Sequence, residues 1–157
     1  MIGKPYPFFS KTYISEADVL FYVFISKGKK NIPKVILFAP IVKRKTRYYN
    51  WGFGDLVVGE NGEYLVDDRV ETNNGDVRKV FYTIVSSLYN FFEVHPEATV
   101  YVEGSSRQRI EIYRQLIFRH WEEIEPFYHI TGGINGQIEE FQSDVGYEYL
   151  LISRRKR

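Results

Sequence analysis

The chain has 157 residues, no cysteine, and 21 lysine and arginine residues against 20 aspartate and glutamate residues, which gives a formal net charge of +1. The absence of cysteine excludes disulfide bonds, thiolate nucleophiles and thiolate-ligated zinc. The balanced charge does not favour a protein that coats nucleic acid, because such proteins usually carry a marked excess of basic residues. The length is typical of one domain, so a single domain over residues 1–157 is expected.

No segment of the sequence suggests a membrane protein. The longest apolar run, Val19–Ile25, is too short to span a bilayer. The first residues lack the basic stretch and the apolar stretch that make up a signal peptide. We therefore expect a cytoplasmic protein without a membrane partner. The aromatic content of 17% favours a large sheet, since aromatic side chains suit the pleated surface of strands.

The first half of the chain predicts an antiparallel meander. Residues 1–18 contain two prolines and are expected to form an N-terminal arm. Four segments rich in β-branched and aromatic residues follow, separated by turns that contain glycine, asparagine or basic residues. The predicted strands are Val19–Ser26, Ile32–Val42, Tyr48–Val58 and Glu63–Glu71.

The second half of the chain predicts helices that alternate with strands. Apolar residues recur at helical spacing over Asp76–Phe92 and again from Ser105 to about Trp121, so two helices are expected. The short segment Thr99–Glu103 between them is predicted to be a strand. A basic tail over 154–157 ends the chain. Three strands before it, of which the first two are joined by a glycine-rich turn, are predicted at Tyr128–Thr131, Gln137–Phe141 and Tyr147–Ser153.

Together these elements predict an α+β fold. Its single sheet should be mixed, mostly antiparallel and of about seven strands, with two main helices and the order β-β-β-β-α-β-α-β-β along the chain. A strand that follows a helical crossover is expected to lie parallel to its neighbour in the sheet.

The sequence carries no recognisable pattern of metal ligands. The three histidines, His95, His120 and His129, are scattered, and His120 falls on the apolar face of the second helix, where a buried structural histidine is expected. Five carboxylates near the fourth strand are compatible with a magnesium site or with a solvated edge that guards the strand against pairing, and we favour the edge. These carboxylates are Asp55, Asp67, Asp68, Glu71 and Asp76. Neither a metal nor a cofactor is predicted.

Basic residues form two clusters in the predicted turns. The first turn carries Lys27, Lys29 and Lys30, and the second turn carries the basic residues of the segment Lys43–Arg47. Successive turns of a meander lie at opposite ends of a sheet, so these clusters should not merge into one patch. The tail over 154–157 is also basic, but a charged terminus often serves only to increase solubility.

The start of the second helix is the predicted anion site. Unpaired backbone N–H groups and the positive end of the helix dipole favour an anion at such a position. The sequence adds two hydroxyls and two guanidinium groups, and the site is expected to comprise Gly104, Ser105, Ser106, Arg107 and Arg109. The start of the first helix, Asn73-Asn74-Gly75-Asp76, offers similar groups, but the carboxylate of Asp76 would repel an anion.

Three short strings resemble those of an uncharacterised bacterial domain family. They are Asn73-Asn74-Gly75-Asp76, Glu103-Gly104-Ser105-Ser106 and the segment from Arg109 to Tyr113. The resemblance covers most of the chain from about Phe21, and it implies no activity.

A second resemblance is to the GNAT-type N-acetyltransferases, through the order of elements and through Ile112–Phe118, which is similar to an LYxxLGF string. It implies coenzyme A as cofactor, Tyr113 as the acid that protonates the departing thiolate, and Asp68 or Glu71 as general base. The sequence departs from that superfamily in two respects. The glycine-rich pyrophosphate loop is missing, and Ile117 stands where a glycine is usual.

Three functions are compatible with these observations. The first is a non-catalytic binding or interaction module of the bacterial cytoplasm, which holds a small phosphate-bearing ligand or a protein partner. The alternative is an acyl-CoA-dependent N-acyltransferase-like enzyme, and the second alternative is a nucleic-acid-associated regulatory protein. The missing glycine loop favours the first function over the enzyme, and the balanced charge favours it over the regulatory protein.

Overall fold

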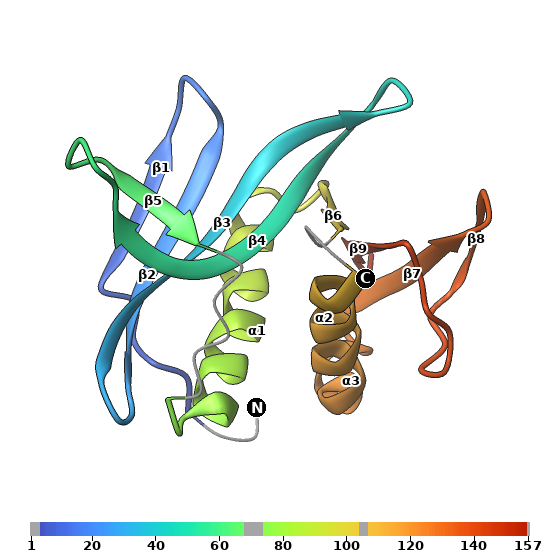
Figure 1. Ribbon diagram of the computed structural model, residues 1–157. Helices are drawn as coiled ribbons and strands as arrows, with labels where there is room; N and C mark the ends of the chain where they lie inside the picture. The colour runs from blue at the N-terminus through green and yellow to red at the C-terminus, as the bar shows by residue number, and fades with distance from the viewer. Residues whose placement is uncertain (1–3, 68–73, 104–106, 157) are drawn as a thin grey trace. The chain divides into compact units, whose positions relative to one another are not determined.

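The computed structural model describes residues 4–67, 74–103 and 107–156. Within these residues the chain is an α+β protein with three helices and a mixed, open sheet of nine strands (Figure 1). None of the helices in this part of the chain is long and apolar enough to cross a membrane.

The chain divides into two compact units. Unit 1 comprises Met1–Ala39 and Gly52–Glu93, and unit 2 comprises Pro40–Trp51 and Val94–Arg157. Two long strands, β3 (Asn31–Lys43) and β4 (Thr46–Val58), contribute residues to both units. Each unit has its own helices and its own buried core, and the two are described separately.

Unit 1 is an antiparallel meander followed by one helix. The strands β1, β2, β3 and β4 are neighbours in that order, and β5 pairs with the end of β4. Their bounds are β1 (Ser10–Ile14), β2 (Val19–Lys27) and β5 (Tyr64–Asp67), and the helix is α1 (Val77–Val94). The strand β1 lies inside the segment expected to be an N-terminal arm, and it forms because its backbone groups pair with the edge of β2.

The core of unit 1 follows from alternation along its strands. In β2 the side chains of Leu20, Tyr22 and Phe24 are buried and those between them are not, as the two-residue period of a strand requires. On β3, the ring of Phe38 stacks on Phe91 of α1 with their centroids 4.3 Å apart. The apolar face of α1 therefore packs on the same sheet face that buries the alternate residues of β2.

Unit 2 contains the only parallel strand pair in the described sheet. The start of β4 runs parallel to β6 (Thr99–Val102), which pairs with β9 (Tyr149–Arg154) in the antiparallel sense. Antiparallel pairs then join β9 to β7 (Tyr128–Ile134) and β7 to β8 (Gln137–Glu140). Parallel pairing after a helical crossover is thus confirmed for β4 and β6. It is wrong for β7, the strand that follows the second crossover, because both of its neighbours, β8 and β9, run antiparallel to it.

Two helices lie between β6 and β7. They are α2 (Arg107–Arg119) and the single turn α3 (Trp121–Ile124). Tyr113 of α2 is 1% exposed, and its ring centroid lies 5.3 Å from that of Trp51. The predicted single helix through Trp121 is interrupted at His120, because α2 ends at Arg119. His120 has φ −108° and ψ 19°, and its carbonyl oxygen accepts hydrogen bonds from the N–H groups of Glu123 and Ile124.

The predicted count of about seven strands and the acetyltransferase-like order are not confirmed. The strand that the sequence did not predict is β1. The strand bounds also differ in the hairpin of β7 and β8, where β7 continues through Gly132 and Gly133. A Cβ atom on Gly132 would overlap the ring of Tyr147, and one on Gly133 would overlap the ring of Tyr149. These glycines therefore serve close approach of two aromatic rings, and the turn itself is Asn135-Gly136, both residues with positive φ.

Candidate functional site

The turn between β2 and β3 is held by the side chain of Asn74, just before α1. The Asn74 amide nitrogen donates to the carbonyl oxygen of Lys30 at 2.8 Å and to Oγ of Ser26 at 2.9 Å. Its Oδ1 accepts from the backbone N–H of Lys30 at 2.8 Å, and its backbone oxygen accepts from the N–H of Lys29 at 2.8 Å. Because Asn74 is only 2% exposed, these bonds fix the turn against the start of the helix.

Two glycines make this contact possible. A Cβ atom at Gly28 would overlap the carbonyl oxygen of Asn74, so the turn can approach only with glycine there. Gly75 has φ +84°, a left-handed conformation that costs other residues energy. The resemblance string Asn74-Gly75-Asp76 therefore has a structural role in the described residues, while Asn73 lies outside them.

Asp76 connects the helix start to the N-terminal segment. Its carbonyl oxygen accepts from the N–H of Val80, and its Oδ2 accepts from the hydroxyls of Tyr6 at 2.5 Å and Ser26 at 2.6 Å. The Tyr6 hydroxyl in turn accepts from the N–H of Lys27 at 2.9 Å. Burial, together with the hydrogen bond to Asp76, raises the pKa of Tyr6 above its usual value. Asp76 is thus engaged in internal hydrogen bonds at the start of α1.

These contacts bring basic residues from three chain segments together. The β2–β3 turn is held at the helix start, and the ammonium of Lys79 lies 4.5 Å from the centroid of the Tyr6 ring. No acidic residue occupies the first turn of α1. We call the resulting set of exposed cations the basic surface of unit 1. It consists of Lys4, Lys27, Lys29, Lys30, Arg78 and Lys79.

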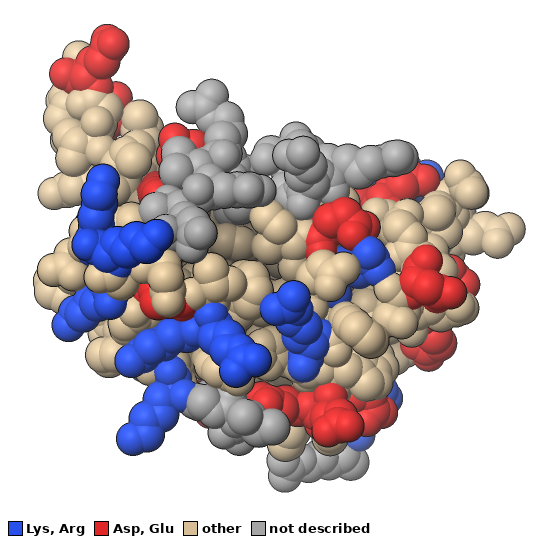
Figure 2. All heavy atoms as spheres, turned by 60° about the horizontal axis from the view of Figure 1, so that its bottom comes forward, with Lys and Arg blue, Asp and Glu red and all other residues tan. Residues whose placement is uncertain are grey.

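Figure 2 looks at the end of the molecule where the β2–β3 turn and the start of α1 lie. Lys and Arg side chains gather there with few acidic side chains between them. The sequence indicated Lys27, Lys29 and Lys30 as a cluster but gave no reason to join them to Lys4, Arg78 and Lys79, which lie far away along the chain. The sequence feature that could have indicated this contact is Asn74, because asparagine side chains often form hydrogen bonds with backbone groups of turns.

The second predicted basic cluster, the segment Lys43–Arg47, belongs to unit 2. Its turn residues Arg44 and Lys45 have φ +49° and +67°, which is unusual for residues other than glycine, asparagine and aspartate. The ammonium of Lys43 lies 3.2 Å from a carboxylate oxygen of Glu103. Part of the charge of this cluster is therefore neutralised within the unit.

The anion site predicted at the start of the second helix cannot be placed. Gly104, Ser105 and Ser106 lie outside the described residues, as do the side chains of Arg107 and Arg109, although α2 does begin at Arg107. Asp68 and Glu71, the bases implied by the acetyltransferase resemblance, also lie outside them.

Tyr113 is a core residue of unit 2. Its hydroxyl donates a 3.1 Å hydrogen bond to the backbone oxygen of Trp51, and its side chain is almost completely buried. His120 is likewise buried, as expected, and burial lowers its pKa below 6.5. Both side chains therefore contribute to packing at the positions where the sequence placed them on an apolar helix face.

The described carboxylates near β5 do not form a metal site. Asp55 lies 2.5 Å from the ammonium of Lys34, and both residues are buried. Asp67 lies opposite Asp55 in the pairing of β5 with β4. Among the described residues, no group of three or more histidine, aspartate or glutamate side chains is arranged to hold a metal ion.

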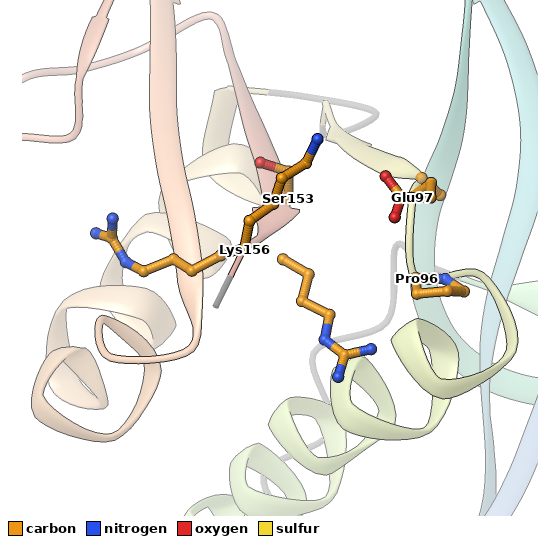
Figure 3. A pocket seen from close by; sticks show the side chains of 7 residues that line it. Pro96, Glu97, Ser153 and Lys156 are labelled. Carbon is orange, nitrogen blue, oxygen red and sulfur yellow. The ribbon is translucent and has the colours of Figure 1, made fainter.

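An open pocket of about 400 Å³ lies in unit 2, between the residues before β6 and the end of β9 (Figure 3). The predicted basic tail lines one side of the pocket with Arg154, the last residue of β9, and with Arg155 and Lys156, which follow it. The guanidinium of Arg155 donates to the backbone oxygen of Glu125 at 2.7 Å and lies 3.3 Å from its carboxylate, and Glu97 adds a negative charge to the lining. The pocket is thus less positively charged than the basic surface of unit 1.

The fold and its sites define a two-unit α+β protein with a hydrogen-bonded basic surface. The chain belongs to a family of unknown function (DUF6934), whose model matches residues 5–155. No curated protein and no solved structure matches it. The expectation of an uncharacterised family is therefore confirmed, and the resemblance to acetyltransferases is not supported.

Proposed function

We propose that this protein is a binding module of the bacterial cytoplasm that holds a phosphate-bearing ligand on the basic surface of unit 1. The observation that carries this proposal is that Asn74 fixes the turn with Lys27, Lys29 and Lys30 at the start of α1, where Arg78 and Lys79 are also exposed. Like charges repel, so a fold that holds them together gains from an anion placed between them. The binding energy of that anion offsets the repulsion.

The chemistry of the cations favours phosphate. Five of the six are lysines, and the sixth is Arg78. A lysine ammonium is a compact point charge that binds phosphate oxygens, and the guanidinium of Arg78 can add a bidentate contact to a phosphate. The surface is therefore suited to phosphate groups.

Asp76 opposes binding less than its position in the sequence suggests. Its Oδ2 already accepts two hydroxyl hydrogen bonds, from Tyr6 and Ser26, at 2.5 and 2.6 Å. The two hydroxyls that donate to it partly offset its negative charge, and among the described residues the six cations of the basic surface outnumber it. The attraction of the surface for an anion therefore prevails.

The site predicted at Gly104–Arg109 remains a second proposal for the same ligand class. It rests on the sequence alone, since its hydroxyl and guanidinium groups are suited to phosphate. We rank it below the basic surface because the hydrogen bonds that hold the basic surface together lie within the described residues. Both sites are tested in the same experiment.

The test is a titration of the isotope-labelled protein with sodium tripolyphosphate, followed by backbone amide shifts at constant ionic strength. We expect saturable shifts at the amides of Gly28, Lys29, Lys30 and Gly75. The variant Lys29→Gln/Lys30→Gln should weaken binding, and Arg44→Gln/Lys45→Gln, which removes the same charge from the other turn, should not. Shifts confined to residues 104–109 would transfer the function to the second site, and the absence of saturable shifts would contradict the proposal.

A further inference from the structure

We infer that the ligand of the basic surface is the phosphate backbone of a nucleic acid duplex, an inference that rests on the proposed function. The overall charge of +1 argues against this partner only if the charges are evenly mixed. They are not, because the turn with Lys27, Lys29 and Lys30 is hydrogen-bonded to the start of α1, and Lys79 of α1 lies over Tyr6, two residues after Lys4. Local charge, not the sum over the chain, determines the attraction of a surface for DNA or RNA.

The backbone that carries these cations is held by hydrogen bonds, which favours a rigid polyanion. Asn74 fixes the turn by three hydrogen bonds of 2.8–2.9 Å through its side chain, and the hydroxyl of Tyr6 fixes the N-terminal segment on Asp76 and Lys27. A backbone already held in place loses little freedom when it binds a ligand whose charges are also fixed. A duplex offers phosphates at regular spacing, whereas a flexible acidic tail has to be ordered first.

Tyr6, the ring that contacts a cation of this surface, offers unpaired bases no platform for stacking. Its side chain is 7% exposed, and the ammonium of Lys79 lies 4.5 Å from the ring centroid. Proteins that bind single strands usually combine cations with exposed aromatic rings. Cations on a surface whose contacting ring is buried contact phosphates and do not read bases, so we expect binding to a duplex that is independent of sequence.

The test measures the binding of fluorescently labelled duplexes of two unrelated sequences by anisotropy, from 50 to 200 mM salt. If all six cations contact phosphates, the slope of log K against log salt is about −5, and affinity falls about 1000-fold over that range. In Lys29→Gln/Lys30→Gln the slope should become less steep by about 2, with equal effects on both sequences. The control Arg44→Gln/Lys45→Gln, with the same loss of net charge, should bind like the parent protein.

Other outcomes separate this inference from the function on which it rests. Amide shifts with tripolyphosphate but no binding of either duplex would overturn the inference and leave the proposed function standing. Tighter binding of a single strand, of polyglutamate or of phosphatidylserine vesicles than of duplex would also overturn it, in favour of that partner. An equal loss of duplex binding in the control variant would show that the basic surface is not the docking site.

Discussion

The bonds of Asn74 should contribute a large share of the stability of unit 1, and Asn74→Ala tests this. The substitution removes the donors to Lys30 and Ser26 and the acceptor of the Lys30 N–H, three bonds of 2.8–2.9 Å at a residue that is 2% exposed. At about 1 kcal/mol net for each bond, we expect a loss of about 3 kcal/mol in the free energy of unfolding. The total free energy of unfolding of a globular protein is only about 5–15 kcal/mol.

Urea denaturation measures this loss. With an m value of about 2 kcal/mol/M, a loss of about 3 kcal/mol lowers the midpoint by about 1.5 M. The matched control is Asn61→Ala, since Asn61 is exposed in the turn between β4 and β5, and its substitution should change stability by less than about 0.5 kcal/mol. Equal midpoints for the two variants would mean that water replaces the bonds of Asn74 without cost, and the account of a fixed turn would be refuted.

Three further predictions concern unit 2. Tyr113→Ala should lower the free energy of unfolding by about 3–5 kcal/mol. Tyr113→Phe loses only the hydrogen bond to the backbone oxygen of Trp51 and should lower it by about 1 kcal/mol. Similar melting temperatures of the two variants would contradict the core position of Tyr113. Gly132→Ala should destabilise the protein because its methyl group overlaps the ring of Tyr147, and the added substitution Tyr147→Ala should make Gly132→Ala less costly, as a double-mutant cycle can show. Burial lowers the pKa of His120 in the folded state, so the unfolded state takes up a proton at a higher pH than the folded state does. The free energy of unfolding should therefore fall as the pH drops below 6.5. His120→Gln should reduce that fall between pH 7 and pH 5 in urea titrations, and an unchanged pH profile would refute this prediction.

Local patterns in the sequence determined most of the elements. The β-branched and aromatic residues of Val19–Ser26 predicted β2, and the helical spacing from Val77 to Phe91 predicted α1. These predictions succeed because such side chains suit a pleated strand and because the apolar period of a helix depends only on backbone geometry. The burial of Tyr113 followed from the same rule.

Contacts between distant segments determined the rest. The sequence placed Gly132 and Gly133 in a turn, whereas in the structure they lie in β7 because the rings of Tyr147 and Tyr149 pack on them. Residues 10–14 form a strand only because the edge of β2 is available to pair with them. Neither neighbour can be recognised from local spacing.

The candidate site shows the same division. The sequence by itself determined that Lys27, Lys29 and Lys30 form a basic turn and that Asn74 and Asp76 stand before a helix. Only the tertiary structure decided that Asn74 bonds to that turn, and that Lys4, Arg78 and Lys79 thereby join its cations. The physical reason is that charge accumulates on a surface through side chains that are close in space, and hydrogen bonds between residues more than forty positions apart create that proximity.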